Sequence, residues 1–293
     1  MKQITEFINE KLIINKNTKI EKVKHKYHPE TKEELEELID KLTKERGHDA
    51  DLNDIDTSKI TDMSGIFSHD QFKAGSLNFT GDISQWDVSN VEHMNSMFAY
   101  SDFNGDISEW DVRNVKSMAS MFQHCKFNGD ISNWRTDNLE NMAWMFAAAE
   151  FDGDLSKWDV SNVTSMESLF TCSKFTGKKG DISNWDVSKV TNMKDMFRRT
   201  KFNTDISKWD VSLVHSMSSM FQEAEFNQDI SNWNISNVTS MWNMFEKSKF
   251  DKDLSKWKIN KDCFTADMFD DCPIEKNDKL PKWYHKEKKI NLG

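Results

Sequence analysis

The amino-acid sequence predicts an α/β solenoid: nine coils of about 24 residues, each with a short strand and a short helix, behind an N-terminal helical cap. Two ladders of aromatic residues predict the coils, and two hydrophobic periods inside each repeat predict the strand and the helix. The 293 residues divide into a segment over 1–50, the repeats over 51–269 and a C-terminal cap or tail over 270–293.

The first ladder consists of tryptophans in a constant context, at intervals of 24 residues with a single interval of 27. They are Trp86, Trp110, Trp134, Trp158, Trp185, Trp209, Trp233 and Trp257. A phenylalanine follows each of them twelve residues later, and Ile55 precedes Phe67 by the same distance. The phenylalanines therefore close nine units: Phe67, Phe98, Phe122, Phe146, Phe170, Phe197, Phe221, Phe245 and Phe269.

Each unit changes its hydrophobic period part-way through. In the unit over 103–122, Trp110 and Val112 lie two residues apart, which places both on one face of an extended segment. The next apolar residues follow the spacing of a helical stripe: Val115, Met118, Met121 and Phe122. A short strand followed by one or two helical turns is the predicted result.

Residues 1–50 carry none of the repeated words. One stripe predicts a first helix, with Ile4, Phe7, Ile8 and Leu12. Thr31 and Glu34 form a capping box that opens a second helix, which Gly47 ends and whose inward residues are Leu35, Leu38, Ile39 and Leu42. Residues 20–27 between them predict a weak strand or loop. This segment is either a cap on the first coil or a targeting segment.

The repeated words FNGDISEWDV and SNVTSMESLF resemble the BspA-like leucine-rich-repeat family and, more narrowly, a mycoplasma-lipoprotein-type repeat of unknown function. The resemblance covers about residues 51 to 269. It implies a right-handed solenoid of leucine-rich type and surface attachment or protein binding, and it implies no enzyme activity. The opening MKQITEFINEKL is similar to N-terminal segments that direct internal proteins into the heads of tailed phages.

The charge balance disfavours two classes of partner. The chain has 39 basic and 49 acidic residues, so its net charge of -10 repels nucleic acid and anionic membrane surfaces. It contains no run of 18 apolar residues, and its opening lacks the apolar core of a secretory signal. We expect a cytoplasmic or phage-particle protein with no nucleic-acid or membrane partner.

An aspartate precedes every tryptophan of the ladder by four residues, from Asp82 to Asp253. Such a row either binds cations between coils or accepts backbone N–H groups in Asx turns. The four cysteines and eight histidines show no metal-ligand or nucleophile spacing, although Cys263 and Cys272 are close enough in sequence to meet. We expect free thiols, no cofactor and no enzymatic activity.

Two surfaces are candidates for partner binding. Residues beside the ladder tryptophans point outward and change from acidic, with Asp87 and Asp111, to basic, with Lys256 and Lys258. This face predicts weak binding or end-to-end self-association. Trp144 occupies a slot that holds Ser in other repeats, and Trp242 one that holds Asn, Ala, Glu, Lys or Ser. Both are expected to anchor a partner unless an insertion or the N-terminal segment covers them.

The combined prediction is a non-enzymatic solenoid that acts as a protein-interaction or scaffold module for an unidentified protein partner. The alternative is a structural or packaged component of a tailed-phage particle, with residues 1–14 as its address.

Overall fold

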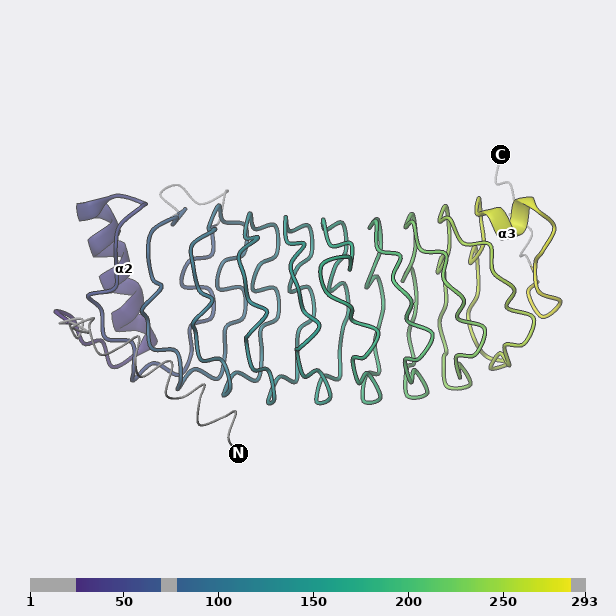
Figure 1. Ribbon diagram of the computed structural model, residues 1–293, viewed down its shortest axis with the longest axis horizontal. Helices are drawn as coiled ribbons and strands as arrows, with labels where there is room; N and C mark the ends of the chain where they lie inside the picture. The colour runs from purple at the N-terminus through teal and green to yellow at the C-terminus, as the bar shows by residue number, and fades with distance from the viewer. Residues whose placement is uncertain (1–24, 70–77, 286–293) are drawn as a thin grey trace, which may run out of the picture.

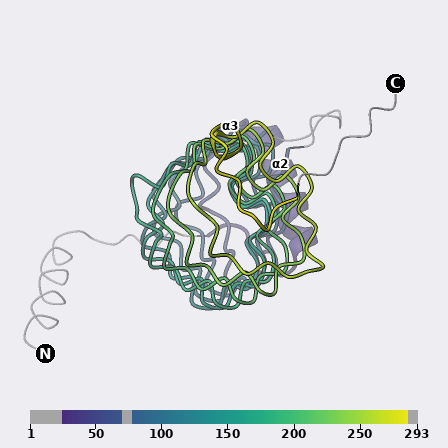
Figure 2. The same cartoon turned by 90° about the vertical axis from the view of Figure 1, so that its right-hand side faces the viewer.

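A computed structural model describes residues 25–69 and 78–285. Successive repeats each make one coil, and the coils lie on one another from the N-terminal to the C-terminal end (Figure 1). Seen along the stack they superpose into one ring (Figure 2). The predicted first helix, with Ile4, Phe7, Ile8 and Leu12, and the predicted address over 1–14 lie outside the described residues.

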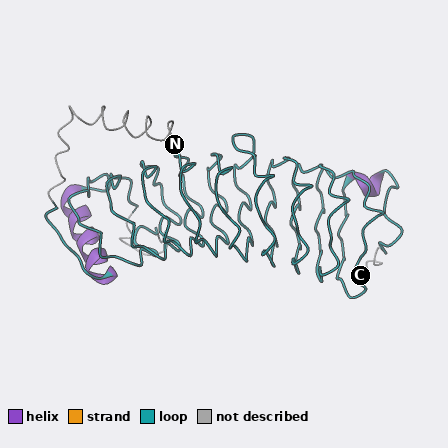
Figure 3. Cartoon of the chain, turned by 60° about the horizontal axis from the view of Figure 1, so that its bottom comes forward, coloured by secondary structure: helices purple, strands orange, loops and turns teal. Residues whose placement is uncertain are grey.

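The predicted coil of strand plus helix is wrong. The helices of the described chain are α2 (Lys32–Arg46) and the single-turn α3 (Pro273–Lys276), and the rest of it is loop and turn (Figure 3). Instead of a sheet, isolated parallel bridges join neighbouring coils. The longest series runs through Asp62, His93, Ser117, Asn141, Ser165, Asn192, Ser216, Ser240 and Phe264.

The segment predicted as a helix is a pair of successive turns, here called the double turn. Alternate amides leave their own coil: N–H groups of Met118, Ser120 and Phe122 each donate to a carbonyl of the next coil at 2.9 Å. The amides between them close turns within the coil, since Met121 donates to Met118 and Gln123 to Ser120, both at 3.1 Å. No helical ladder of i→i−4 hydrogen bonds forms, because every second backbone N–H donates to the next coil instead.

Two residues of each double turn adopt the left-handed conformation, which ends each turn before a helix can continue. In one coil these are Ser120, with φ of 57°, and His124, with φ of 53°. The first position recurs as Ser96, Ser120, Trp144, Ser168, Asp195, Ser219, Asn243 and Asp267, and the second as Tyr100, His124, Ala148, Cys172, Arg199, Glu223, Lys247 and Asp271. The side chains of the predicted helical stripe are nevertheless buried: Val115, Met118, Met121 and Phe122.

Aromatic ladders fill the core along the whole stack. The indole of Trp134 is 2% exposed and stacks on Trp110 and Trp158 at 6.4 and 6.0 Å. Its Nε1 donates to the carbonyl of Ile107 at 3.0 Å, so the polar atom of the ring is satisfied by the preceding coil. The closing phenylalanines stack at 5.6 to 5.8 Å.

The C-terminal tail continues the tryptophan ladder. Trp283 stacks on Trp257 at 6.3 Å, and its Nε1 donates to the carbonyl of Leu254 at 3.0 Å, as each ladder tryptophan does to the coil before it. The tail therefore covers the apolar end of the last coil with a residue of the same type.

Helix α2 lies at the N-terminal end of the stack (Figure 1). Thr31 accepts the N–H of Glu34 at its start as predicted, and Gly47 ends it. Leu35, Ile39 and Leu42 are buried and Leu38 is partly buried, so the helix shields the first coil. Arg46 joins it to that coil through both carboxylate oxygens of Asp54, each at 2.9 Å.

Substitution of Ser120 tests the double turn against the helix first expected there. Glycine adopts the left-handed conformation without strain, whereas alanine does not, so Ser120→Gly should be more stable than Ser120→Ala by about 1 kcal/mol. A helix would reverse the order by a similar amount. Urea denaturation of the two variants decides, and a more stable Ser120→Ala would contradict the double turn.

Asp56 predicts a pH dependence at the N-terminal end. Its carboxylate accepts from the hydroxyl of Ser58 at 2.7 Å, from the Ser58 N–H at 3.1 Å and from His28 Nδ1 at 3.1 Å, and these bonds lower its pKa to about 2. The ionised form is thus favoured by folding, so the stabilisation is complete above the unfolded pKa of 3.8 and is lost as pH falls towards 2. Asp56→Asn should cost about 2 kcal/mol at pH 7 and almost nothing at pH 2. Denaturation at both pH values measures this, and an equal cost at the two would refute it.

Candidate functional site

The aspartate row is a series of Asx turns. In each of the eight coils with a ladder tryptophan, the Oδ1 atom accepts the N–H of the serine two residues later, at 2.8 to 3.0 Å, as in Asp106 and Asp154. The remaining members are Asp82, Asp130, Asp181, Asp205, Asp229 and Asp253. The serine N–H holds the pKa of Asp130, Asp205 and Asp229 below its usual range. The Asx-turn interpretation is therefore confirmed, and no described group of His, Cys, Asp or Glu side chains could hold a metal ion.

The predicted acidic-to-basic face is present but its acidic end is engaged. Asp87 accepts the N–H of Ser89 at 3.0 Å, and Asp111 binds the guanidinium of Arg113, whose Nε lies at 2.7 Å. Lys256 and Lys258 are exposed at the other end of the stack. The structure does not bring the four residues together, because six coils lie between that of Asp87 and that of Lys256.

Trp144 and Trp242 are both exposed, by 37% and 44%. Each lies in a double turn, and Trp144 occupies the left-handed position itself, with φ of 62°. Side chains in these two slots are not exposed in every coil, since Ser168 and Ser219 in the Trp144 slot and Ser218 in the Trp242 slot are buried. No described segment covers either indole completely.

Five residues on the double turns of four successive coils are here called the aromatic turn face: Tyr100, His124, Trp144, Ala148 and Cys172. Tyr100 is 42% exposed and stacks on His124 at 4.7 Å. Ala148 and Cys172 take the same slot in the next two coils, and backbone bonds of 2.7 to 2.8 Å keep the row in register. Sequence reasoning found Trp144 but missed this pair of rings, because their stacking requires two coils in register.

The corresponding surface of the later coils is charged instead. Its ion pairs include Arg199 with Glu223 at 2.9 Å, and Lys247 with Glu246 at 2.8 Å. Trp242 belongs to the same coil as Glu246 and Lys247. The two exposed tryptophans therefore differ in their surroundings.

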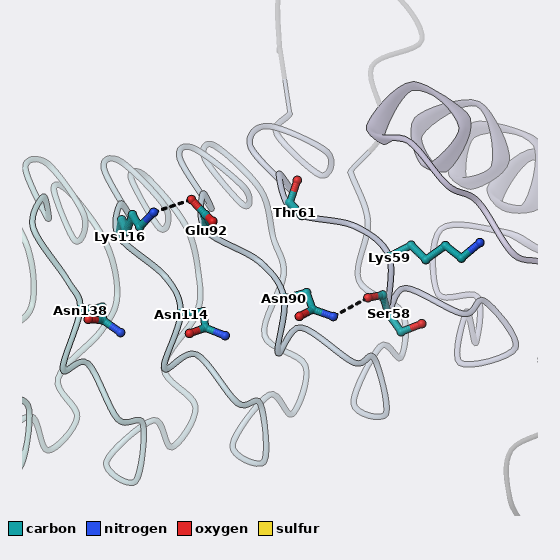
Figure 4. Close-up of a pocket in the computed structure, with 8 residues that line it drawn as sticks. All are labelled: Ser58, Lys59, Thr61, Asn90, Glu92, Asn114, Lys116 and Asn138. Carbon is teal, nitrogen blue, oxygen red and sulfur yellow. Dashed lines mark hydrogen bonds and ion pairs between the residues drawn. The ribbon is translucent and has the colours of Figure 1, made fainter.

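A polar groove runs along another side of the stack (Figure 4). One wall is a row of asparagines in successive coils, Asn90, Asn114 and Asn138; the other is the row Thr61, Glu92 and Lys116, with Ser58 and Lys59 at one end. We call it the asparagine groove; its volume is about 670 Å³. Each asparagine donates Nδ2 to a carbonyl of the preceding coil, at 2.7 to 2.8 Å.

With this geometry in hand, comparison with known proteins identifies the repeat. The model of a family described as a Mycoplasma protein of unknown function, DUF285, matches residues 33–126, 70–179 and 171–283. The chain belongs to the DUF285 family. The match does not assign this DUF285 chain to the BspA-like or leucine-rich-repeat family. Only the mycoplasma-type repeat of the expected resemblance is shown. No curated protein and no solved structure matches it.

None of the four cysteines of this DUF285 chain is joined to another by a disulfide in the part of the chain that the structure describes. Burial raises the pKa of Cys263 and of Cys272 to about 11, so both are protonated at neutral pH. Cys172 is exposed on the aromatic turn face. None of the helices in residues 25–69 and 78–285 is long and apolar enough to cross a membrane.

Calcium is expected to leave the melting midpoint of the DUF285 chain unchanged at millimolar concentration. Each aspartate of the row already uses Oδ1 in its own turn, and one carboxylate per coil supplies too few ligands for Ca²⁺. Differential scanning calorimetry with calcium, and with magnesium as the control, measures this. A midpoint that rises with calcium alone would restore the cation ladder.

Proposed function

We propose that this DUF285 chain is a non-enzymatic scaffold that binds another protein through the aromatic turn face. The observation that carries the proposal is that two large aromatic side chains, Trp144 and Tyr100, are exposed on double turns two coils apart, and that Tyr100 stacks on His124 of the coil between them. Aromatic side chains dominate the energetics of protein interfaces, and exposed apolar patches of this kind mark interaction sites.

Rigidity of the surface supports the same proposal. The backbone of each double turn is bonded to both neighbouring coils, so the side chains it presents need little ordering on binding. The coils around Trp242 carry ion pairs on the corresponding surface, which makes Trp144 the expected anchor. The alternative of a packaged phage component stays a prediction, since its address over 1–14 lies outside the described residues.

Trp144→Ser is the test of the proposed interface. Serine occupies this left-handed slot as Ser96, Ser120 and Ser168, so the fold should accept it. We expect loss of an anchor worth about 2 kcal/mol or more, which weakens partner binding at least about thirtyfold. Quantitative mass spectrometry of proteins captured from the native host, followed by affinity measurement with the purified partner, provides the readout.

Trp242→Ser is the matched control, because its ring is similarly exposed but lies among charged coils. It should retain the partner. Equal retention by Trp144→Ser, or a loss of stability as large as the 3 to 5 kcal/mol expected for a core tryptophan such as Trp134, would refute the interface.

A further inference from the structure

The asparagine groove presents fixed hydrogen-bond acceptors at regular steps. Because Nδ2 of Asn90, Asn114 and Asn138 is held by the preceding coil, each carboxamide is locked and its Oδ1 cannot exchange places with the nitrogen. No described residue donates to these Oδ1 atoms. The row repeats once per coil, at about 4.8 Å, the spacing of neighbouring extended segments.

The row of open acceptors ends where the sequence changes. Asn162 continues it, but its Oδ1 accepts Nζ of Lys189 at 2.7 Å. Lys189 and Leu213 take the asparagine slot in the next two coils, and the row resumes only with Asn237. The groove is therefore a bounded site over the N-terminal coils and not a general property of the stack.

The charges of the groove are paired within the chain. Lys116 Nζ lies 2.7 Å from Glu92, and Lys59 forms an ion pair with Glu30. Each charged side chain of the lining is thus already paired with one of opposite sign, and the chain as a whole carries -10. Both facts disfavour a phosphate polymer and favour an uncharged ligand with many hydroxyl groups.

An extended peptide fits the groove less well. Strand addition needs a free edge of backbone N–H and C=O groups. Here the amides of Glu92, Lys116 and Glu140 donate to the preceding coil, at 2.8 to 2.9 Å. The backbone beneath the groove is already paired, so recognition falls to side chains.

We propose that the asparagine groove binds a linear, uncharged glycan, with one sugar unit per coil. Sugar hydroxyls donate to the Oδ1 atoms of Asn90, Asn114 and Asn138, and Thr61, Glu92 and Lys116 contact the opposite edge of the chain. A hexose unit in an extended β-linked glycan advances by a distance close to the step between coils, so successive units meet successive asparagines. This site is separate from the aromatic turn face and does not depend on the proposed protein interface.

Asn114→Leu is the variant that tests the proposal. Leu213 occupies the same slot in another coil with 47% exposure, so the stack accepts leucine there. Isothermal titration calorimetry of the full chain uses hexasaccharides of β-linked glucose, xylose, mannose and N-acetylglucosamine. We expect at least one to bind and Asn114→Leu to weaken its affinity at least tenfold, with Asn138→Leu giving the same loss.

Asn237→Leu is the matched control. Asn237 makes the same inward bond, to the carbonyl of Ser212 at 2.7 Å, but has Leu213 and Lys261 on either side in its row. Asn237→Leu should lose the same stability as Asn114→Leu and keep full glycan affinity. Trp144→Ser should also keep full glycan affinity. The proposal is overturned if none of the four glycans binds the unmodified chain, or if Asn237→Leu weakens binding as much as Asn114→Leu.

Discussion

The stack depends on how each double turn divides its amides. Every second N–H, such as that of Ser120, donates to the following coil, and the others close turns inside their own coil. A single coil therefore leaves half of these donors unsatisfied, at a cost that only a neighbour removes. Backbone pairing and the aromatic ladders act on the same pairs of coils, so stability is cooperative between neighbours.

The division of amides also determines what lies on the surface. Left-handed residues are needed where each turn ends, and their side chains range from buried, as in Ser168, to exposed, as in Trp144 and Tyr100. Polar residues fill most of these slots, but Trp144 and Tyr100 do not follow that pattern. The same geometry that closes the core thus leaves a rigid outer row whose chemistry varies from coil to coil without affecting packing.

Burial was predictable from the sequence, whereas the local backbone was not. Met118, Met121 and Phe122 are buried as their spacing predicts, but two successive turns satisfy that spacing as well as a helix does. A signal against the helix was present in the slot of Ser120, which holds Gly65 in the first coil and Asn243 in a later one. Glycine and asparagine in one slot are typical of the left-handed conformation.

The candidate sites differ in the same way: features that depend on local sequence were predictable, and features that depend on the register of neighbouring coils were not. The Asx turns followed from an aspartate with serine two residues later, because that bond is local. The exposure of Trp144 followed from the polar residues that share its slot. The asparagine groove did have a signal, since asparagine recurs four residues after Trp86, Trp110 and Trp134, but its meaning depends on which row faces it across the coil. The stacking of Tyr100 on His124 needs the register of two coils, which only the structure supplies.

The three extra residues near Gly177 to Gly180 leave the ladder intact: Trp185 still donates Nε1 to the carbonyl of Leu155 at 3.0 Å, the distance found elsewhere in the stack. The hydrogen bond from the ladder tryptophan to the preceding coil is thus the same at the insertion as in the next coil. Gain or loss of a whole unit during gene duplication would need no new packing solution, because the joined ends already match. Array length is consequently an evolvable trait in such a protein, separable from the identity of the residues that it displays.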